Sequence, residues 1–126
     1  MISHFTRALV LTAALAGSAS ALAPAANAAG KFDGTWSVMI VTRAGGCDPS
    51  YRFGGQIING IIYYTGGGPV SLTGRVAPSG AISVTVSSGA NHAVGTGRLS
   101  ANSGGGTWRG QGPSGACSGS WSAQRG

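Results

Sequence analysis

Residues 51–65 read Tyr51-Arg-Phe-Gly-Gly-Gln-Ile-Ile-Asn-Gly-Ile-Ile-Tyr-Tyr-Thr65 and contain the clearest local signal in the chain. Asn59-Gly60 separates two runs rich in β-branched and aromatic residues, the side chains that favour strands. A type I′ turn needs positive φ at both central positions, and Asn-Gly meets this need well. The stretch therefore predicts a β-hairpin with strands at 51–58 and 61–65.

The rest of the chain repeats the strand pattern. Apolar residues such as Ile82 and Val84 alternate with polar ones, and no window places apolar residues at helical spacing. Pro-Ser-Gly at 78–80 predicts a three-residue loop that pairs Val76 with Ile82, and Asn-Ser at 102–103 predicts a two-residue turn. Eight strands are expected, at 34–43, 51–58, 61–65, 70–76, 81–88, 93–100, 106–111 and 117–123.

Eight short antiparallel strands in one small domain predict an all-β fold, an up-and-down barrel, with a β-sandwich as the alternative. A closed barrel has no unpaired edge strands. Closure would bring Cys117, at the start of the last strand, close to Cys47, just past the end of the first. We therefore expect a Cys47–Cys117 disulfide. A reactive pair or a metal site is the competing interpretation, but there is no Cys-x-x-Cys spacing and only one His follows residue 28.

The 24 glycines have a place in this barrel. The Asn59 turn would set Tyr64 opposite Gly55, and the turn at 102–103 would set Trp108 opposite Gly97. An aromatic ring laid over a glycine of the neighbouring strand covers its bare backbone, a device found in curved sheets. Strand glycines also permit the bends that a narrow barrel needs.

The first residues predict export. Arg7 precedes an apolar run at 8–16 that is too short to span a bilayer, and Ala26-Asn-Ala28 fits the small-residue rule of signal-peptide cleavage. We expect residues 1–28 to be a signal peptide cleaved after Ala28, and residues 29–126 to form one barrel domain without a transmembrane segment. The protein would then be secreted or periplasmic, where two cysteines form a disulfide by default.

The composition argues against an enzyme. The 2 acidic residues, Asp33 and Asp48, stand next to Gly and Pro, as turn residues do. General acid–base catalysis would have to use these two or His92, which lies in a predicted loop. Neither a Gly-x-Ser-x-Gly elbow nor a phosphate-binding loop occurs. We expect no catalytic residue, no cofactor and no bound metal.

Gly34-Thr-Trp36, a late Arg125 and the strand count resemble the calycin group of barrels, which includes avidin-like proteins. In that group a Gly-x-Trp of the first strand packs against a basic residue of the last, so the resemblance implies contact between Trp36 and Arg125. The chain also resembles bacterial barrel inhibitors of proteases in size, export and single disulfide. Residues 32–38 (Phe-Asp-Gly-Thr-Trp-Ser-Val) and 117–121 (Cys-Ser-Gly-Ser-Trp) resemble more closely a group of small secreted glycine-rich β proteins of soil alphaproteobacteria. That last resemblance implies no particular activity.

A net charge of +6 and two surface features favour a binding function. Arg75, Arg98 and Arg109 take the outward register of their strands and predict a basic stripe, which would attract acidic polysaccharide or lipid headgroups. Export argues against nucleic acid as the partner. Alternatively, the arginines only keep a glycine-rich barrel soluble.

The hairpin at 51–65 is the second feature because it is apolar on both faces. Four residues share the expected inner face: Phe53, Ile57, Ile62 and Tyr64. On the outer face, Ile58, Ile61 and Tyr63 lie with Arg52, a composition typical of protein interfaces. Alternatively, a loop packs over this face or the strand is twisted inward.

These observations predict a secreted or periplasmic protein that binds without catalysis, either to an anionic envelope or polysaccharide surface or to an exported protein partner. The second hypothesis is an inhibitor of an exported hydrolase, such as a protease or lysozyme. The third is a carrier of a small apolar ligand. Eight strands enclose just enough room for side chains, and Trp36, Trp108, Trp121 and Tyr64 could fill it, which disfavours the carrier.

Overall fold

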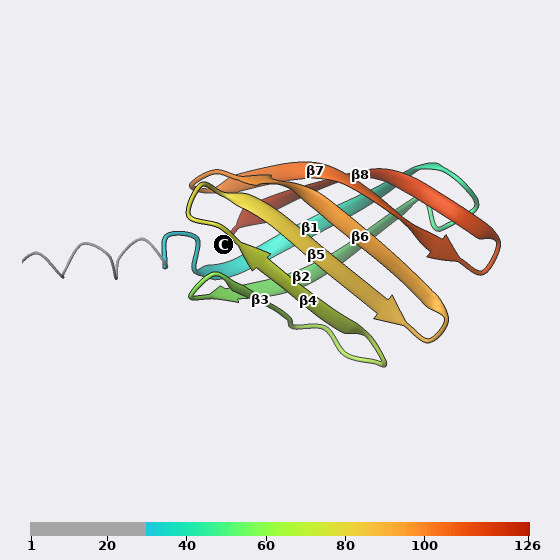
Figure 1. Ribbon diagram of the computed structural model, residues 1–126, viewed down its shortest axis with the longest axis horizontal. Helices are drawn as coiled ribbons and strands as arrows, with labels where there is room; N and C mark the ends of the chain where they lie inside the picture. Colours follow the sequence, from blue (N-terminus) through green and yellow to red (C-terminus); the bar gives the residue numbers. More distant parts are fainter. Residues whose placement is uncertain (1–29) are drawn as a thin grey trace, which may run out of the picture.

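The structure is a computed structural model that describes residues 30–126, and these form a closed antiparallel β-barrel (Figure 1). The predicted signal peptide and its cleavage site after Ala28 lie outside the described residues. Among the residues described, no helix is long and apolar enough to cross a membrane. The strands are β1 (Gly34–Ala44), β2 (Ser50–Ile58), β3 (Ile61–Tyr64), β4 (Ser71–Val76), β5 (Ala81–Ser88), β6 (Asn91–Leu99), β7 (Ser103–Gly112) and β8 (Gly115–Arg125).

Each strand pairs with its neighbours in the sequence, and β8 closes the barrel against β1. The eight-stranded up-and-down barrel predicted from the sequence is therefore confirmed, and the sandwich is not formed. Asn59 and Gly60 have φ of 51° and 78°, as the predicted turn requires. This turn sets Tyr64 opposite Gly55, as expected.

The other turns set the remaining registers. The loop at 78–80 pairs Val76 with Ile82, as predicted. The turn between β6 and β7 lies one residue earlier than predicted, since the amide of Ser100 donates to the carbonyl of Ser103 and leaves 101–102 at the tip. The register therefore shifts by two, and Trp108 lies opposite Gly95, not Gly97. A shift of two keeps every side chain on its predicted face.

Strands β6 to β8 also continue into segments that their glycine, serine and proline content predicts as loops. Ser88 pairs with Asn91, and Gly112 pairs with Gly115, so both connections shrink to two-residue turns. Gly89 and Gly115 adopt positive φ at these turns, which an L side chain rarely does. The sheet is thus longer at this end than the sequence pattern indicates.

The hydrophobic core lies at one end of the barrel. This is the end where β1 begins and β8 finishes (Figure 1). The buried members of the core are Phe32, Trp36, Ile57, Val76, Leu99 and Ala123. Because all of them sit at or near the strand ends or turns of this one end, they plug the barrel there. We call this the sealed end, and the opposite one, with the connections near residues 45–49, 65–70, 89–90 and 113–114, the open end.

Arg125 completes the sealed end. Its guanidinium lies 5.3 Å from the centre of the Trp36 ring, so the contact that the calycin resemblance implies is present. The same guanidinium donates hydrogen bonds to the carbonyl oxygens of Asp33 (2.6 Å), Ala101 (2.8 Å) and Lys31 (3.2 Å). One cation thereby ties the start of the barrel domain to the last strand and to the turn between β6 and β7.

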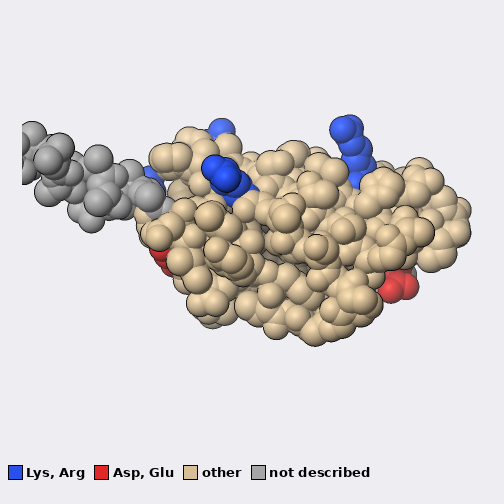
Figure 2. All heavy atoms as spheres, turned by 60° about the horizontal axis from the view of Figure 1, so that its bottom comes forward, with Lys and Arg blue, Asp and Glu red and all other residues tan. Residues whose placement is uncertain are grey.

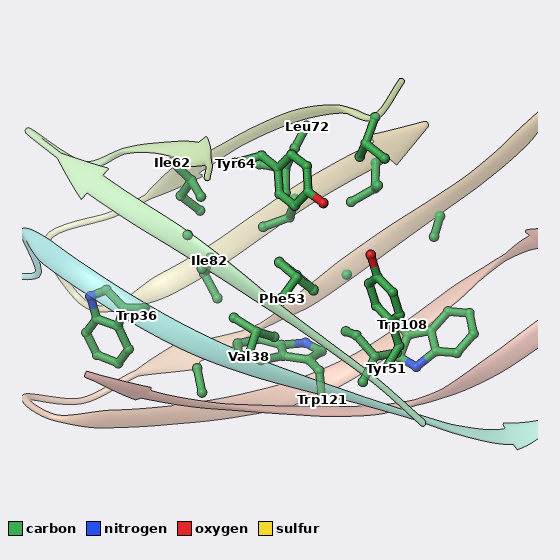
Figure 3. A pocket seen from close by; sticks show the side chains of 18 of the residues that line it. Trp36, Val38, Tyr51, Phe53, Ile62, Tyr64, Leu72, Ile82, Trp108 and Trp121 are labelled. Carbon is green, nitrogen blue, oxygen red and sulfur yellow. The ribbon is translucent and has the colours of Figure 1, made fainter. Parts of the chain in front are cut away.

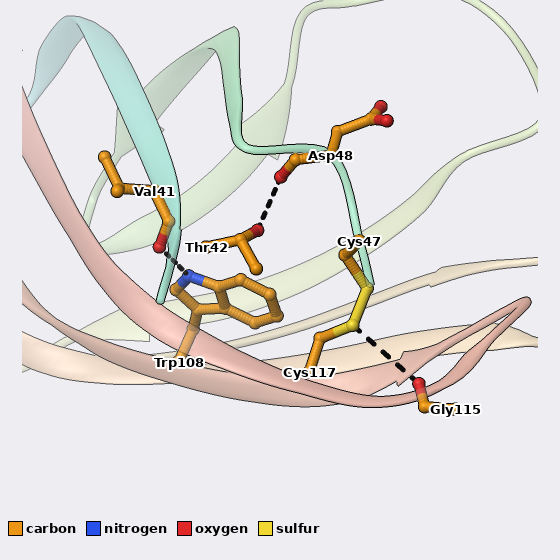
Figure 4. The surroundings of a disulfide bond; sticks show 7 residues. All are labelled: Val41, Thr42, Cys47, Asp48, Trp108, Gly115 and Cys117. Atoms are coloured by element: carbon orange, nitrogen blue, oxygen red, sulfur yellow. Dashed lines mark hydrogen bonds between the residues drawn. A yellow bond between two sulfur atoms is a disulfide. The ribbon is translucent and has the colours of Figure 1, made fainter. Parts of the chain in front are cut away.

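The predicted disulfide between Cys47 and Cys117 holds the same β1–β8 seam at the open end (Figure 4). The two residues are 70 positions apart, so the bond restricts the unfolded chain strongly. Cys117 is buried, whereas Cys47 belongs to the loop after β1. Disulfides of this kind are typical of oxidising compartments outside the cytoplasm.

Candidate ligand-binding cavity

The inward side chains leave a cavity of about 520 Å³ inside the barrel (Figure 3). Alternate residues of each strand face it because successive side chains of a strand point to opposite sides. Aliphatic residues of β4 and β5, such as Leu72, Val84 and Val86, form part of its wall. Six aromatic rings also line the cavity: Trp36, Tyr51, Phe53, Tyr64, Trp108 and Trp121.

The expectation that four aromatic side chains fill the interior is therefore wrong, and the glycines explain why. A Cβ atom at Gly97 would lie 2.7 Å from the ring of Trp121, and one at Gly119 would lie 3.0 Å from Nε1 of Trp108. Both rings lie against strand glycines, close to the wall. Because glycine has no side chain, each of these two rings can lie flat against the wall and leave the centre of the barrel empty. Counting inward-facing side chains does not account for this space.

The three indole N–H groups are all bonded to backbone carbonyls. Trp36 donates to Phe32 (3.0 Å), Trp108 to Val41 (3.1 Å, Figure 4) and Trp121 to Thr96 (3.1 Å). A buried indole N–H usually needs such a partner. Because the polar edges of the rings are satisfied within the protein, the tryptophans present mainly apolar ring surface to the cavity.

A second aromatic group lines β2 and β3. The ring centre of Phe53 lies 6.1 Å from that of Tyr51 and 6.1 Å from that of Tyr64. The Tyr64 hydroxyl donates to the carbonyl of Gly67 at 3.5 Å, in the loop that follows β3. A hydrogen bond with the Tyr51 side chain raises the pKa of Tyr64, and desolvation adds to this. The Tyr64 hydroxyl is thus neutral at physiological pH.

The cavity reaches solvent at the open end. Its lining there includes Asp48, Tyr51, Val70, Ser88 and Asn91, and Tyr51 is half exposed. A second hollow of about 460 Å³ adjoins it and shares several of these residues. At the other end Trp36 and Leu99, both buried in the core, form the floor. The site is therefore a deep apolar pocket with a polar mouth.

The three arginines of the predicted stripe face outward but are not brought together. Arg75 lies on β4, Arg98 near the sealed end of β6, and Arg109 on β7 opposite Val94, toward the open end. Arg98 is engaged, since its Nη1 donates to the carbonyl of Ser79 at 3.1 Å. Basic side chains accordingly appear as separate projections in Figure 2. A continuous basic stripe is not formed.

The outer face of the hairpin is exposed. Ile58, Ile61 and Tyr63 are 46%, 42% and 47% accessible, so no described loop packs over them. Arg75 lies directly opposite Ile61 on the neighbouring strand, and Arg52 is also exposed on this side. We refer to Ile58, Ile61 and Tyr63 as the outer patch, and its role in binding stays a prediction.

The sequence pattern predicted the inward face of the hairpin but missed the mouth. The sequence indicates a turn at Asp48, and Asn91 precedes the strand expected at 93–100. Alternation along a strand tells which residues point inward, but only the paths of the connecting loops place these two around one opening. The extra length of β6 brings Asn91 to the rim.

Comparison with known protein families, curated proteins and solved structures finds no match to this chain. Of the resemblances drawn from the sequence, the eight-stranded antiparallel barrel is what the structure supports.

Proposed function

We propose that this protein is an exported, non-catalytic binding protein that holds a small, mainly apolar molecule inside the barrel. The observation that carries the proposal is the cavity of about 520 Å³, lined by aromatic rings and open at one end. Small-molecule sites in proteins have volumes of roughly 300–1,000 Å³ and predominantly apolar walls with a few polar groups. The cavity fits this description in size and in composition.

The energetics also favour an apolar occupant. Each methylene group moved from water into such a site contributes about 0.8 kcal/mol. The floor is formed by the packed core, and the indole rings are held by hydrogen bonds to the backbone, so the walls need little reorganisation. A preformed site loses less free energy to ordering when the ligand binds.

A probe-binding experiment tests the proposal. The exported protein, with its disulfide intact, is titrated with the uncharged fluorescent probe N-phenyl-1-naphthylamine. The variant Val84→Trp places a large ring in the cavity, and the control Thr85→Trp places the same ring on the outside of the same strand. We expect probe affinity to fall at least about tenfold in Val84→Trp and to be unchanged in Thr85→Trp.

Two results would overturn the proposal: failure of this probe and of an unrelated apolar probe to bind the folded protein, or equal binding by the two variants. Near-ultraviolet circular dichroism establishes that each variant is folded. If Val84→Trp fails to fold, Val86→Phe, which adds a smaller ring to the same wall, replaces it.

A second function is favoured by the outer patch. Three exposed apolar side chains with Arg75 beside them have the composition of a partner-binding surface, either for an exported protein or for an anionic lipid or polysaccharide surface. Replacement of Ile61 and Tyr63 by Ser would weaken such binding and leave probe binding intact. Inhibition of an exported hydrolase stays a prediction, which protease and lysozyme assays would test.

A further inference from the structure

The charges around the mouth differ from those of the protein as a whole. The described residues carry a large excess of Lys and Arg, yet none of these lines the cavity or the adjoining hollow. Asp48 lines both, and it is the only acidic residue that lines either. In Figure 2 the acidic side chains stand apart from the projecting basic ones. The mouth of a basic protein thus presents a negative charge.

The backbone of Asp48 is fixed, while its carboxylate is free. Thr42 donates its hydroxyl to the Asp48 carbonyl (2.5 Å) and its amide to the carbonyl of Pro49 (2.9 Å). On the other side, Cys47 is held by the disulfide (Figure 4). Within residues 30–126 the carboxylate itself has no hydrogen-bond partner and no ion pair. It is therefore held at the rim with its capacity to accept hydrogen bonds unused.

The aromatic rings at the mouth suit a cation better than an anion. Tyr51 and Trp108 contribute aromatic rings beside this rim, and the negative faces of such rings attract cations. The indole N–H groups are already bonded to carbonyls, so they offer nothing to a carboxylate or phosphate. An anionic headgroup would also lie beside Asp48 without a compensating positive charge.

We propose that the ligand is an amphipathic ammonium compound, whose apolar part lies in the cavity and whose positive end lies at the mouth beside Asp48 and the rings of Tyr51 and Trp108. The inference rests on the proposed function, since it names the chemical class of the molecule that occupies the cavity. Its basis is charge complementarity at a site whose walls are otherwise apolar.

Three probes of equal chain length test the proposal: decyltrimethylammonium, decanol and decanoate, each used to displace N-phenyl-1-naphthylamine. We expect the ammonium compound to bind about five- to tenfold more tightly than decanoate, as one partly exposed ion pair and cation–π contact would give. Asp48→Asn is expected to remove this preference and to leave decanol affinity unchanged. Asp33→Asn, the same charge change at the sealed end, is the control and keeps the preference.

The outcomes separate the two proposals. Equal binding of the three probes, or tighter binding of decanoate, would overturn the ammonium inference while the apolar cavity site stands. Loss of the preference in Asp33→Asn as well as in Asp48→Asn would show that net charge, not the mouth, is responsible, and would also overturn it. If decanol and the fluorescent probe both fail to bind, the proposed function itself is wrong and the inference with it.

Discussion

The two ends of the barrel are formed by the same eight strands but differ in what fills them. At the sealed end, Trp36 is 3% exposed and is packed against Arg125 and the buried core. At the open end Tyr51, another inward aromatic residue of the sheet, is 50% exposed and borders a cavity. If the proposed function is correct, stability depends mainly on the sealed end and ligand binding mainly on the open end. Substitutions at the sealed end should therefore lower stability most, and substitutions at the open end should change binding most.

The largest effect on stability is expected at the sealed end. Trp36→Ala removes a buried ring and its contact with Arg125, and should lower the free energy of unfolding by about 3–5 kcal/mol. Urea denaturation under non-reducing conditions measures it. Tyr51→Ala is the matched change at the open end and should cost less than about 1 kcal/mol because its ring is half exposed. An equal decrease in the free energy of unfolding in the two variants would contradict the view that the sealed end provides most of the stability.

The disulfide should have the next largest effect. Replacing Cys47 and Cys117 together by Ser removes the constraint on a loop of 70 positions and should lower the free energy of unfolding by about 2–4 kcal/mol. Because Arg125 still holds the other end of the β1–β8 seam, we expect the double variant to fold at room temperature. Denaturation of the double variant beside the oxidised protein measures the difference, and an unchanged midpoint would refute the predicted role.

A smaller effect on stability should distinguish alanine substitutions at two glycines, Gly95 and Gly97, that lie on the same face of β6. A Cβ atom at Gly97 would collide with the carbonyl oxygen of Gly105 and lie 2.7 Å from Trp121, whereas the nearest neighbour of one at Gly95 is 3.7 Å away. Gly97→Ala should therefore destabilise the protein by about 1–3 kcal/mol, and Gly95→Ala should be nearly neutral. Thermal unfolding of the pair tests this, and equal melting temperatures would contradict the tight packing of Trp121 on the wall.

The strands and most of their pairings could be predicted because two local signals agreed. Alternation assigned the inward faces, and turn residues such as Asn59-Gly60 set the registers. The turn after β6 differs from the prediction by one residue because Ala-Asn at 101–102 and Asn-Ser at 102–103 are both acceptable tips. The seam disulfide could be predicted because export favours pairing of the only two cysteines and closure of the barrel brings them together.

The cavity could not be predicted because it depends on side-chain conformation. Whether Trp108 and Trp121 cross the interior or lie on the wall is decided by their contacts with glycines on neighbouring strands and by hydrogen bonds to Val41 and Thr96. The position of Asp48 depends on the loop after β1, which has no periodicity to reveal its path. The alternation of apolar and polar residues identifies which side chains face the interior of a barrel, but it does not show whether they fill it or leave a cavity.

The most direct test of a ligand site inside the barrel is a methyl NMR titration of the folded protein with decyltrimethylammonium or decanol. The methyl groups of Val84 and Val86 face the cavity, whereas those of Ile58 and Ile61 lie on the outer patch. We predict saturable shifts, with one ligand bound per protein, that are confined to the valines and their inward neighbours. Saturable shifts confined to Ile58 and Ile61, with the valines unchanged, would contradict binding inside the barrel.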